Sequence, residues 1–194
     1  MVSQVYLVRH GETAWSESGR HTGSTEVSLT EKGEKDALAL AGRLKGAGFS
    51  RVFISPRQRA RKTCELAGWG SAAEVDPDLS EWDYGAYEGM RTAEILSQRP
   101  GWNLFGDGCP GGETPGQVGA RADRLIGRLR AIVGSVALFS HGHFGRVLGA
   151  RWAELPVTAG ERLLLDTASL SILGFEHGSA ASPVLALWNE RPPG

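Results

Sequence analysis

Short apolar runs alternate with amphipathic stretches along most of the chain. The apolar runs predict buried strands at residues 5–8, 51–55, 136–139, 169–175 and 184–188. Apolar residues at three- and four-residue spacing predict helices at residues 30–47 and 117–133, and we also expect helices at residues 58–67, 92–98 and 144–153. Residues 14–29, 68–80 and 102–115 lack this periodicity, so we expect loops there, with a short extended piece near Val75.

This alternation of strands and helices indicates the architecture. Helices that connect parallel strands cover both faces of the sheet that the strands form. We therefore expect a three-layer α/β sandwich with a mostly parallel sheet. The 194 residues, 41% of them hydrophobic, suffice for one sizeable core, and we expect a single domain over residues 1–194.

The composition argues against several classes of function. A formal net charge of −1 provides no basic field for nucleic acid or for an anionic membrane. No apolar stretch reaches the ~20 residues of a membrane span, and Arg9 comes too early for a signal peptide, so we expect a cytoplasmic protein. Cys64 and Cys109 lie far apart and in no Cys-x-x-Cys motif, which indicates neither a disulfide framework nor a zinc ribbon.

Basic residues follow three of the predicted strands. Arg9-His10-Gly11 ends the first strand, Arg59 follows the second, and His141-Gly142 follows the strand at 136–139. The carboxyl ends of parallel strands converge on one crevice, so these side chains should meet. Two arginines and two imidazoles around one point would form a phosphate site, because guanidinium donors match phosphoryl oxygens. Taken alone, each basic stretch is better explained as a solvated strand end or helix face.

Two polar stretches add candidate groups. Thr22 and Gly23 place a hydroxyl beside an unhindered backbone N–H, which suits a phosphate or sugar oxygen but equally an ordinary turn. Glu81 lies among the aromatic residues of segment 79–89. A carboxyl group beside aromatic rings loses solvation, which favours its protonated form, as a general acid requires. An aromatic cluster with outward-pointing acids is the alternative that composition leaves open.

Five sequence blocks, taken together and in order, carry a family resemblance. They are Arg9-His10-Gly11-Glu12-Thr13, Arg20…Thr22-Gly23, Ser55…Arg59-Ala60…Thr63, Leu79…Glu81…Tyr84-Gly85…Glu88-Gly89 and Ser140-His141-Gly142. In this order they resemble the histidine phosphatase superfamily, in its phosphoglycerate mutase-like branch.

The resemblance implies a phosphoglycerate mutase-like fold and a role for each matching residue. It makes His10 the nucleophile that accepts the phosphoryl group, and Glu81 the acid that protonates the leaving oxygen and later activates water. It assigns Arg9, Arg59 and His141 to the phosphate. An imidazole that attacks must be neutral at the attacking nitrogen, so the other ring nitrogen of His10 should donate to a fixed acceptor, which the sequence does not identify.

The details of the motifs favour a hydrolase within this family. The mutases carry an arginine after the catalytic glutamate and a later Arg-Arg pair, whereas Trp82 follows Glu81 here and no Arg-Arg dipeptide occurs. The residues within the motifs resemble those of bacterial acid phosphatases and of sedoheptulose-bisphosphatase-like proteins. We therefore expect a small phosphorylated metabolite as substrate, with seven substrate-binding candidates: Ser16, Thr22, Gly23, Trp82, Tyr84, Gly142 and His143.

Other functional classes are less well supported. His141-Gly142-His143 and His10-Gly11-Glu12 contain metal-ligand residue types, but two arginines at the same point would repel a divalent cation, so we expect no metal and no cofactor. A silent phospho-ligand-binding module would lack the nucleophile or the acid. The apolar tail strands suit a homodimer or an edge cover, and residues 102–115 are a candidate lid whose Trp102 and Phe105 wall a pocket or belong to the core.

Overall fold

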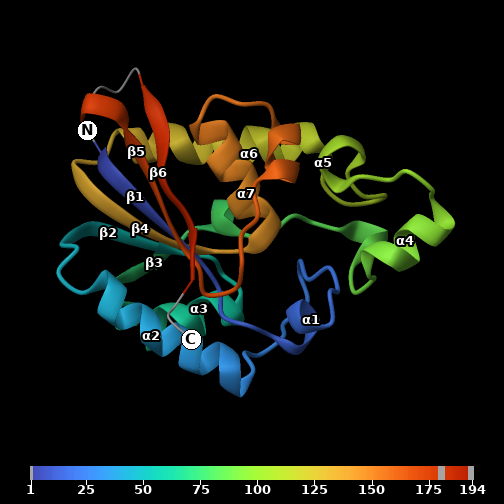
Figure 1. Ribbon diagram of the computed structural model, residues 1–194, viewed down its shortest axis with the longest axis horizontal. Coiled ribbons are helices and arrows are strands. Elements are labelled where there is room, and N and C mark those ends of the chain that lie inside the picture. The colour runs from blue at the N-terminus through green and yellow to red at the C-terminus, as the bar shows by residue number, and fades with distance from the viewer. Residues whose placement is uncertain (1, 179–181, 192–194) are drawn as a thin grey trace.

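The computed structural model describes residues 2–178 and 182–191, and Figure 1 shows a twisted sheet between two layers of helices. The strands of the sheet are β1 (Val2–Arg9), β2 (Phe49–Ile54), β3 (Ala73–Val75), β4 (Gly134–Ser140), β5 (Leu170–Phe175) and β6 (Pro183–Glu190). Their order across the sheet is β3-β2-β4-β1-β5-β6. The strands β1 to β4 are parallel, whereas β5 runs antiparallel to both of its neighbours. The expected α/β sandwich with a mostly parallel sheet is confirmed.

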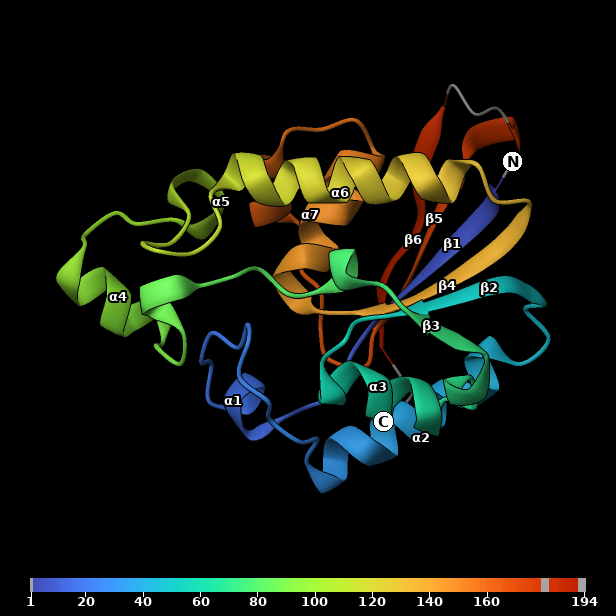
Figure 2. The same cartoon turned by 180° about the vertical axis from the view of Figure 1, so that it is seen from behind.

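Helices cover both faces of this sheet, as Figure 2 shows from behind. They are α1 (Ala14–Glu17), α2 (Glu31–Leu44), α3 (Gln58–Leu66), α4 (Thr92–Gln98), α5 (Leu104–Asp107), α6 (Pro115–Arg130) and α7 (Gly142–Trp152). Side chains alternate across β1, so Leu7 packs in the core beneath α6 and α7, and Val8 packs in the core beneath α2 and α3. Alternate residues of β1 therefore contribute to the hydrophobic cores on both faces of the sheet.

Side-chain caps fix where the two longest helices begin. Thr30 accepts a hydrogen bond from the Gly33 N–H at the start of α2, and Thr114 forms a capping box with Gln117 at the start of α6. From there the helices follow the predicted apolar spacing.

Two of the expected loops contain short helices, which corrects the prediction. In segment 14–29, Thr13 caps α1, and its hydroxyl and the Ser16 side chain bond each other's backbone N–H. In segment 102–115, Asn103 caps α5. Each helix has four residues, which is too short to show an apolar period, and a side-chain cap marks its start. The extended piece expected near Val75 is β3, which pairs with β2.

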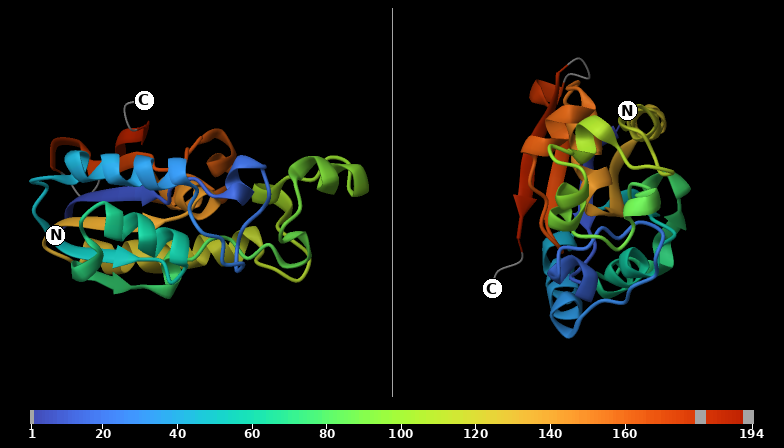
Figure 3. Two further views of the ribbon diagram at one scale, coloured as in Figure 1. Left: turned by 90° about the horizontal axis from the view of Figure 1, so that it is seen from below. Right: turned by 90° about the vertical axis from the view of Figure 1, so that its right-hand side faces the viewer.

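The register between β1 and β4 places the two candidate histidines side by side. Arg9 of β1 is paired with Ser140 of β4, and the His10 N–H donates to the Ser140 carbonyl at 3.0 Å. His10 and His141 therefore leave adjacent parallel strands at the same edge of the sheet. Figure 3 shows α4 standing away from the sheet, beyond this edge. Within the described residues, no helix has the length and apolar character to cross a membrane, and the cytoplasmic location stays a prediction.

Candidate active site

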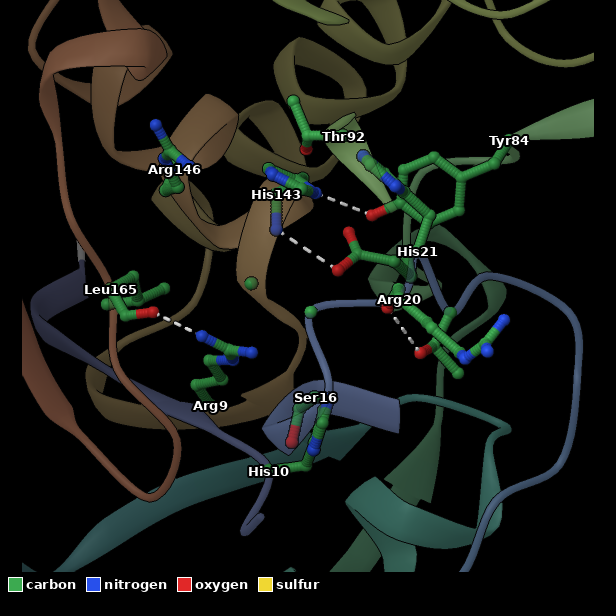
Figure 4. Close-up of a pocket in the computed structure, with 14 residues that line it drawn as sticks. Arg9, His10, Ser16, Arg20, His21, Tyr84, Thr92, His143, Arg146 and Leu165 are labelled. Atoms are coloured by element: carbon green, nitrogen blue, oxygen red, sulfur yellow. Dashed lines mark hydrogen bonds between the residues drawn. The ribbon is translucent and has the colours of Figure 1, made fainter. Parts of the chain in front are cut away.

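A cavity of about 180 Å³ opens at the carboxyl ends of β1 and β4. Figure 4 shows the side chains around it, which come from the end of β1, α1 and the loop after it, residues 81–92, α7, and the segment before β5. Arg9, His10, Glu81 and His143 all line it. The architecture therefore brings together residues up to 134 positions apart in the sequence, as the convergence of parallel strands requires.

His10 has the protonation state that an attacking imidazole needs. Its Nδ1 donates to the Gly11 carbonyl oxygen at 2.7 Å, which supplies the fixed acceptor that the sequence did not identify. Burial, together with the positive charges of Arg59 and Arg9, lowers the pKa of His10 well below its usual 6.5. The ring is therefore neutral with its proton on Nδ1, and Nε2 holds a lone pair.

Three buried side-chain nitrogens without a partner lie on the residues around His10. Within the described part of the chain, Nε of Arg9, Nε of Arg59 and Nδ1 of His141 have no hydrogen-bond partner. The His10 and His141 rings meet edge to face, with centroids 5.2 Å apart. Buried polar groups are almost always satisfied, so three unpartnered nitrogens on neighbouring side chains, two of them guanidinium donors, indicate a site for an anion.

Arg59 also holds the loop that follows α1. Its terminal nitrogens donate to the carbonyl oxygens of Thr22, Gly23 and Thr25 at 2.9–3.0 Å. Burial lowers the pKa of Arg59, and the same is true of Arg9, yet a guanidinium with such a high ordinary pKa keeps its charge. Arg59 therefore links the loop to the charge that faces His10.

Glu81 lies at the amino-terminal end of α7. Its carboxylate accepts the backbone N–H groups of Trp82, His143 and Phe144 at 2.7–3.1 Å. Only 8% of Glu81 is exposed, and it lines both the His10 cavity and a neighbouring one. These contacts fix the Glu81 carboxylate at the wall of the cavity that His10 also lines.

The far wall of the cavity is built from aromatic and imidazole rings. The Tyr84 hydroxyl lies 2.6 Å from Nδ1 of His143, whose ring stacks on His21 at 5.7 Å between centroids. Burial raises the pKa of Tyr84, and burial with the nearby Arg146 lowers the pKa of His143 well below 6.5. Tyr84 therefore keeps its proton and His143 is neutral, so this wall offers neutral hydrogen-bonding groups.

The structure places the predicted substrate-binding residues in two groups. Ser16, Thr22, Tyr84, Gly142 and His143 line the cavity that holds His10. A Cβ on Gly142 would lie 3.1 Å from the Arg9 guanidinium carbon, so a larger residue would require the Arg9 side chain to shift slightly.

Gly23 and Trp82 instead line the neighbouring cavity on the other side of Glu81. The Gly23 N–H donates to the Glu88 carboxylate at 3.0 Å, and the buried Trp82 indole donates to the Glu113 carbonyl at 2.9 Å. The donors that suggested substrate contact are therefore bound to the protein. Trp102 and Phe105 are both buried in the core.

Sequence reasoning missed four lining residues, Arg146, Leu165, Thr92 and Gly19. Arg146 follows His143 by three residues on α7, so helical spacing could have found it. Leu165 comes from a distant loop, and its carbonyl accepts a hydrogen bond from the Arg9 guanidinium, which no sequence signal shows. Arg20, which opens one of the matched blocks, and His21, which lies within that block, also line the cavity.

The other candidate chemistries find less support in this geometry. No group of three or more histidine, cysteine or acidic side chains is arranged to bind a metal ion in the described ranges. Cys64 and Cys109 are unpaired and buried, and burial raises the pKa of each thiol to about 12. A thiol with such a pKa is a poor nucleophile.

Comparison with known proteins agrees with this site. The family model of the histidine phosphatase superfamily (branch 1) matches residues 5–191, so the chain belongs to that superfamily. The chain is 45% identical to an acid phosphatase of Mycobacterium tuberculosis, over 98% of this chain and 95% of the relative. It is 37% identical to the sedoheptulose 1,7-bisphosphatase of Saccharomyces cerevisiae, over 78% of this chain and 68% of that protein.

A solved structure agrees as well. The structure of an open reading frame of Mycobacterium tuberculosis superposes with a TM-score of 0.92 at 41% identity, covering 98% of this chain and 99% of that one. With relatives of this kind matched over nearly the whole length, the chain is an enzyme, a phosphoric monoester hydrolase.

Proposed function

We propose that the chain is a metal-independent, acid phosphatase-like enzyme that hydrolyses small phosphate monoesters through a phosphohistidine on His10. The observation that carries this proposal is the arrangement of three unpartnered buried nitrogens, those of Arg9, Arg59 and His141, around a neutral imidazole whose Nδ1 is bound to Gly11. The donors suit the oxygens of a phosphoryl group, and Nε2 suits the attack on its phosphorus.

In the first step, Nε2 of His10 attacks phosphorus and the bond between phosphorus and the alcohol oxygen breaks. Glu81 gives its proton to the departing oxygen. Arg9, Arg59 and His141 stabilise the charge on the three equatorial oxygens through donors that are already fixed. The alcohol leaves, and the phosphoryl group stays on His10.

In the second step, a water molecule gives a proton to Glu81 and its oxygen attacks phosphorus. The bond between phosphorus and Nε2 breaks, which releases inorganic phosphate and restores neutral His10. The three backbone N–H groups on Glu81 support both roles, because they hold the same carboxylate beside the nucleophile throughout.

The charge of the site supports a mechanism without a metal ion. Arg9 and Arg59 place fixed positive charge next to His10, which repels a divalent cation and supplies the stabilisation that a cation would otherwise provide. We expect turnover to be unchanged after exhaustive treatment with a chelator, and to be insensitive to added Mg²⁺ or Zn²⁺.

One observation favours a sugar bisphosphatase as a second candidate. Arg20 and Arg146 line the cavity in addition to Arg9, and one relative is named a sedoheptulose bisphosphatase. Extra cationic groups suit a substrate with a second anionic group. Phosphoglycerate mutase activity is a weaker candidate, because Trp82 follows Glu81 and no Arg-Arg pair occurs.

A substrate panel combined with a nucleophile variant tests these alternatives. Aryl phosphates, sugar mono- and bisphosphates and phosphoglycerates are compared by kcat/KM, and the highest value identifies the class. His10→Asn should lower turnover of every substrate by at least about 10³-fold, because the covalent step is lost. The matched control is His177→Asn, which changes an exposed histidine in a left-handed conformation that asparagine tolerates. Equal activity of the His10 variant and the control would contradict the proposal.

We also propose that residues 1–194 form a single histidine phosphatase domain that acts on a small phosphorylated metabolite in the cytoplasm. The family match over residues 5–191 supports the single domain. Association into a homodimer is a prediction that sedimentation velocity tests directly. A silent phospho-ligand-binding module predicts tight phosphate binding with no turnover on any member of the panel.

A further inference from the structure

Ser55 contacts His141 behind the site. Its hydroxyl oxygen lies 2.7 Å from Nε2 of His141, and both residues are completely buried. The Ser55 N–H donates to the Phe139 carbonyl at 2.9 Å, which fixes the residue after the end of β2. Nothing in the proposed mechanism so far uses this hydroxyl.

The surroundings indicate which group donates. Burial and the positive charge of Arg59 lower the pKa of His141 well below 6.5, so its ring is neutral and carries one proton. The Ser55 oxygen accepts the Arg57 N–H at 3.3 Å, and among the described residues the imidazole is the one acceptor within reach of the Ser55 hydrogen. Nδ1 of His141 is buried and has no protein partner among the described residues.

A phosphoryl oxygen can only accept hydrogen bonds at this site. Nδ1 of His141 contributes to phosphate binding only when it carries the single proton of the ring, and Nε2 must then accept. A donor on Nε2 is therefore what selects the useful tautomer, in the same way that a carboxylate selects the tautomer of a catalytic histidine in other hydrolases.

We infer that Ser55 is a positioning residue: its hydroxyl donates to Nε2 of His141 and thereby keeps the proton on Nδ1, facing the transferred phosphoryl group. The inference rests on the proposed function for the role of His141. Ser55 itself touches neither substrate nor nucleophile. Its contribution is to fix a donor before the substrate arrives, which spares the site a reorganisation in the transition state.

Three variants separate the hydroxyl from the volume of the side chain. Ser55→Ala removes the donor, and Ser55→Cys fills the space but donates weakly. Both should lower kcat/KM by about 10- to 100-fold, the usual range for a residue that orients a functional histidine. Ser55→Thr keeps the hydroxyl, and at an extended position before Pro56 it should recover activity to within about fivefold where the melting temperature is unchanged.

A double-mutant cycle tests whether Ser55 acts through His141. In a His141→Gln background, Ser55→Ala should lower kcat/KM by less than about twofold, because the ring that it orients is gone. A second 10- to 100-fold loss in that background would show that Ser55 acts elsewhere and would overturn the inference.

Nitrogen NMR of ¹⁵N-histidine-labelled protein reads the tautomer without any substrate. The wild-type protein should show His141 protonated on Nδ1, and Ser55→Ala should shift it towards protonation on Nε2 while His10 stays protonated on Nδ1. A wild-type His141 protonated on Nε2 would overturn the inference regardless of activity. The expected tautomer change in a protein without any phosphatase activity would instead overturn the proposed function and leave the action of Ser55 on His141 in place.

Discussion

The Glu81 carboxylate is held by three backbone N–H groups, two of them from the first turn of α7. Such contacts fix the direction of a side chain more firmly than a flexible partner would. Glu81 also lines the cavity that contains His10. Its oxygens can therefore reach the leaving oxygen of a substrate bound at His10. In the proposed mechanism, the need for this acid depends on how poor the leaving alcohol is.

Glu81→Gln should therefore discriminate between leaving groups. We expect kcat/KM for an alkyl phosphate to fall by about 10²–10⁴-fold, because an alkoxide cannot leave without a proton. For a nitrophenyl phosphate the same variant should lose about tenfold or less. The control is Asp83→Asn, which changes a nearby acid that lines only the neighbouring cavity. An equal loss on both substrates would contradict the role of Glu81 as general acid.

At the scale of single residues, the sequence predicted the principal groups but not their partners. His10, Arg9 and Glu81 lie together as expected, because strand ends and motif order are properties of sequence. The Gly11 carbonyl that orients His10 was missed, since that contact depends on local backbone angles. Gly23 was predicted to offer its N–H, but Glu88, 65 residues away, accepts it.

At the scale of elements, the junction between β1 and α2 depends on two glycines whose backbones touch. A Cβ on Gly33 would lie 2.7 Å from the Glu12 nitrogen and closer still to the Glu12 carbonyl oxygen, and a Cβ on Gly11 would overlap the Gly33 backbone. The Gly11 N–H also donates to the Thr63 hydroxyl of α3 at 2.9 Å. The chain after His10 is thus packed tightly between α2 and α3, which fixes the position of His10.

Alanine substitutions at Gly33 and at Gly42, both in α2, should change the free energy of unfolding in opposite directions. Gly33→Ala introduces a backbone overlap in α2, and we expect it to lower the free energy of unfolding by about 1–3 kcal/mol and to lower activity. Gly42→Ala changes an exposed glycine of the same helix, with nothing within 4 Å of the new methyl group, and should raise stability by about 0.5–1 kcal/mol. Urea unfolding measures both, and equal effects would contradict the packing described here.

The elements that the sequence predicted well are those with many residues on one face. The strand β4 shows a continuous apolar run. The helices α2 and α6 show their apolar spacing over several turns. The four-residue helices α1 and α5 were missed, because four residues are too few to show an apolar period and each helix begins at a single cap, at Thr13 and at Asn103. A cap residue looks the same in a turn as at a helix start.

At the scale of the whole molecule, the strand order could not be predicted, yet it decides the site. β1 lies between β4 and β5, and only adjacency of β1 to β4 places His10 beside His141. The sequence indicated that strand ends converge but not which strands are neighbours. Pairing of residues more than 120 positions apart is set by packing over the entire sheet.

Burial of three neutral histidines should make the fold sensitive to acid. The pKa values of His10, His141 and His143 are lowered well below 6.5, first by burial and then by nearby positive groups. Below pH ~6.5 the unfolded chain binds protons that the folded chain does not, so stability is full above that pH and falls as the pH drops towards the lowered values. Each histidine contributes up to about 1.4 kcal/mol per pH unit.

Urea unfolding at pH 7.5, 6.5, 5.5 and 5.0 measures this dependence. The free energy of unfolding should decline below pH ~6.5, and the slope should be about one third smaller in His143→Phe, which removes one of the three groups. A free energy of unfolding that stays constant from pH 7.5 to 5.0 would show that these imidazoles are not held neutral.

The central claim is the covalent intermediate on His10, and rapid quenching tests it most directly. The enzyme is mixed with an aryl phosphate labelled with ³²P, quenched in base within milliseconds, digested and analysed by mass spectrometry. We expect an acid-labile, base-stable phosphate on the peptide that contains His10, formed before steady-state turnover and absent from His10→Asn. Full turnover with no label on that peptide at any time, or label on another residue, would contradict the account.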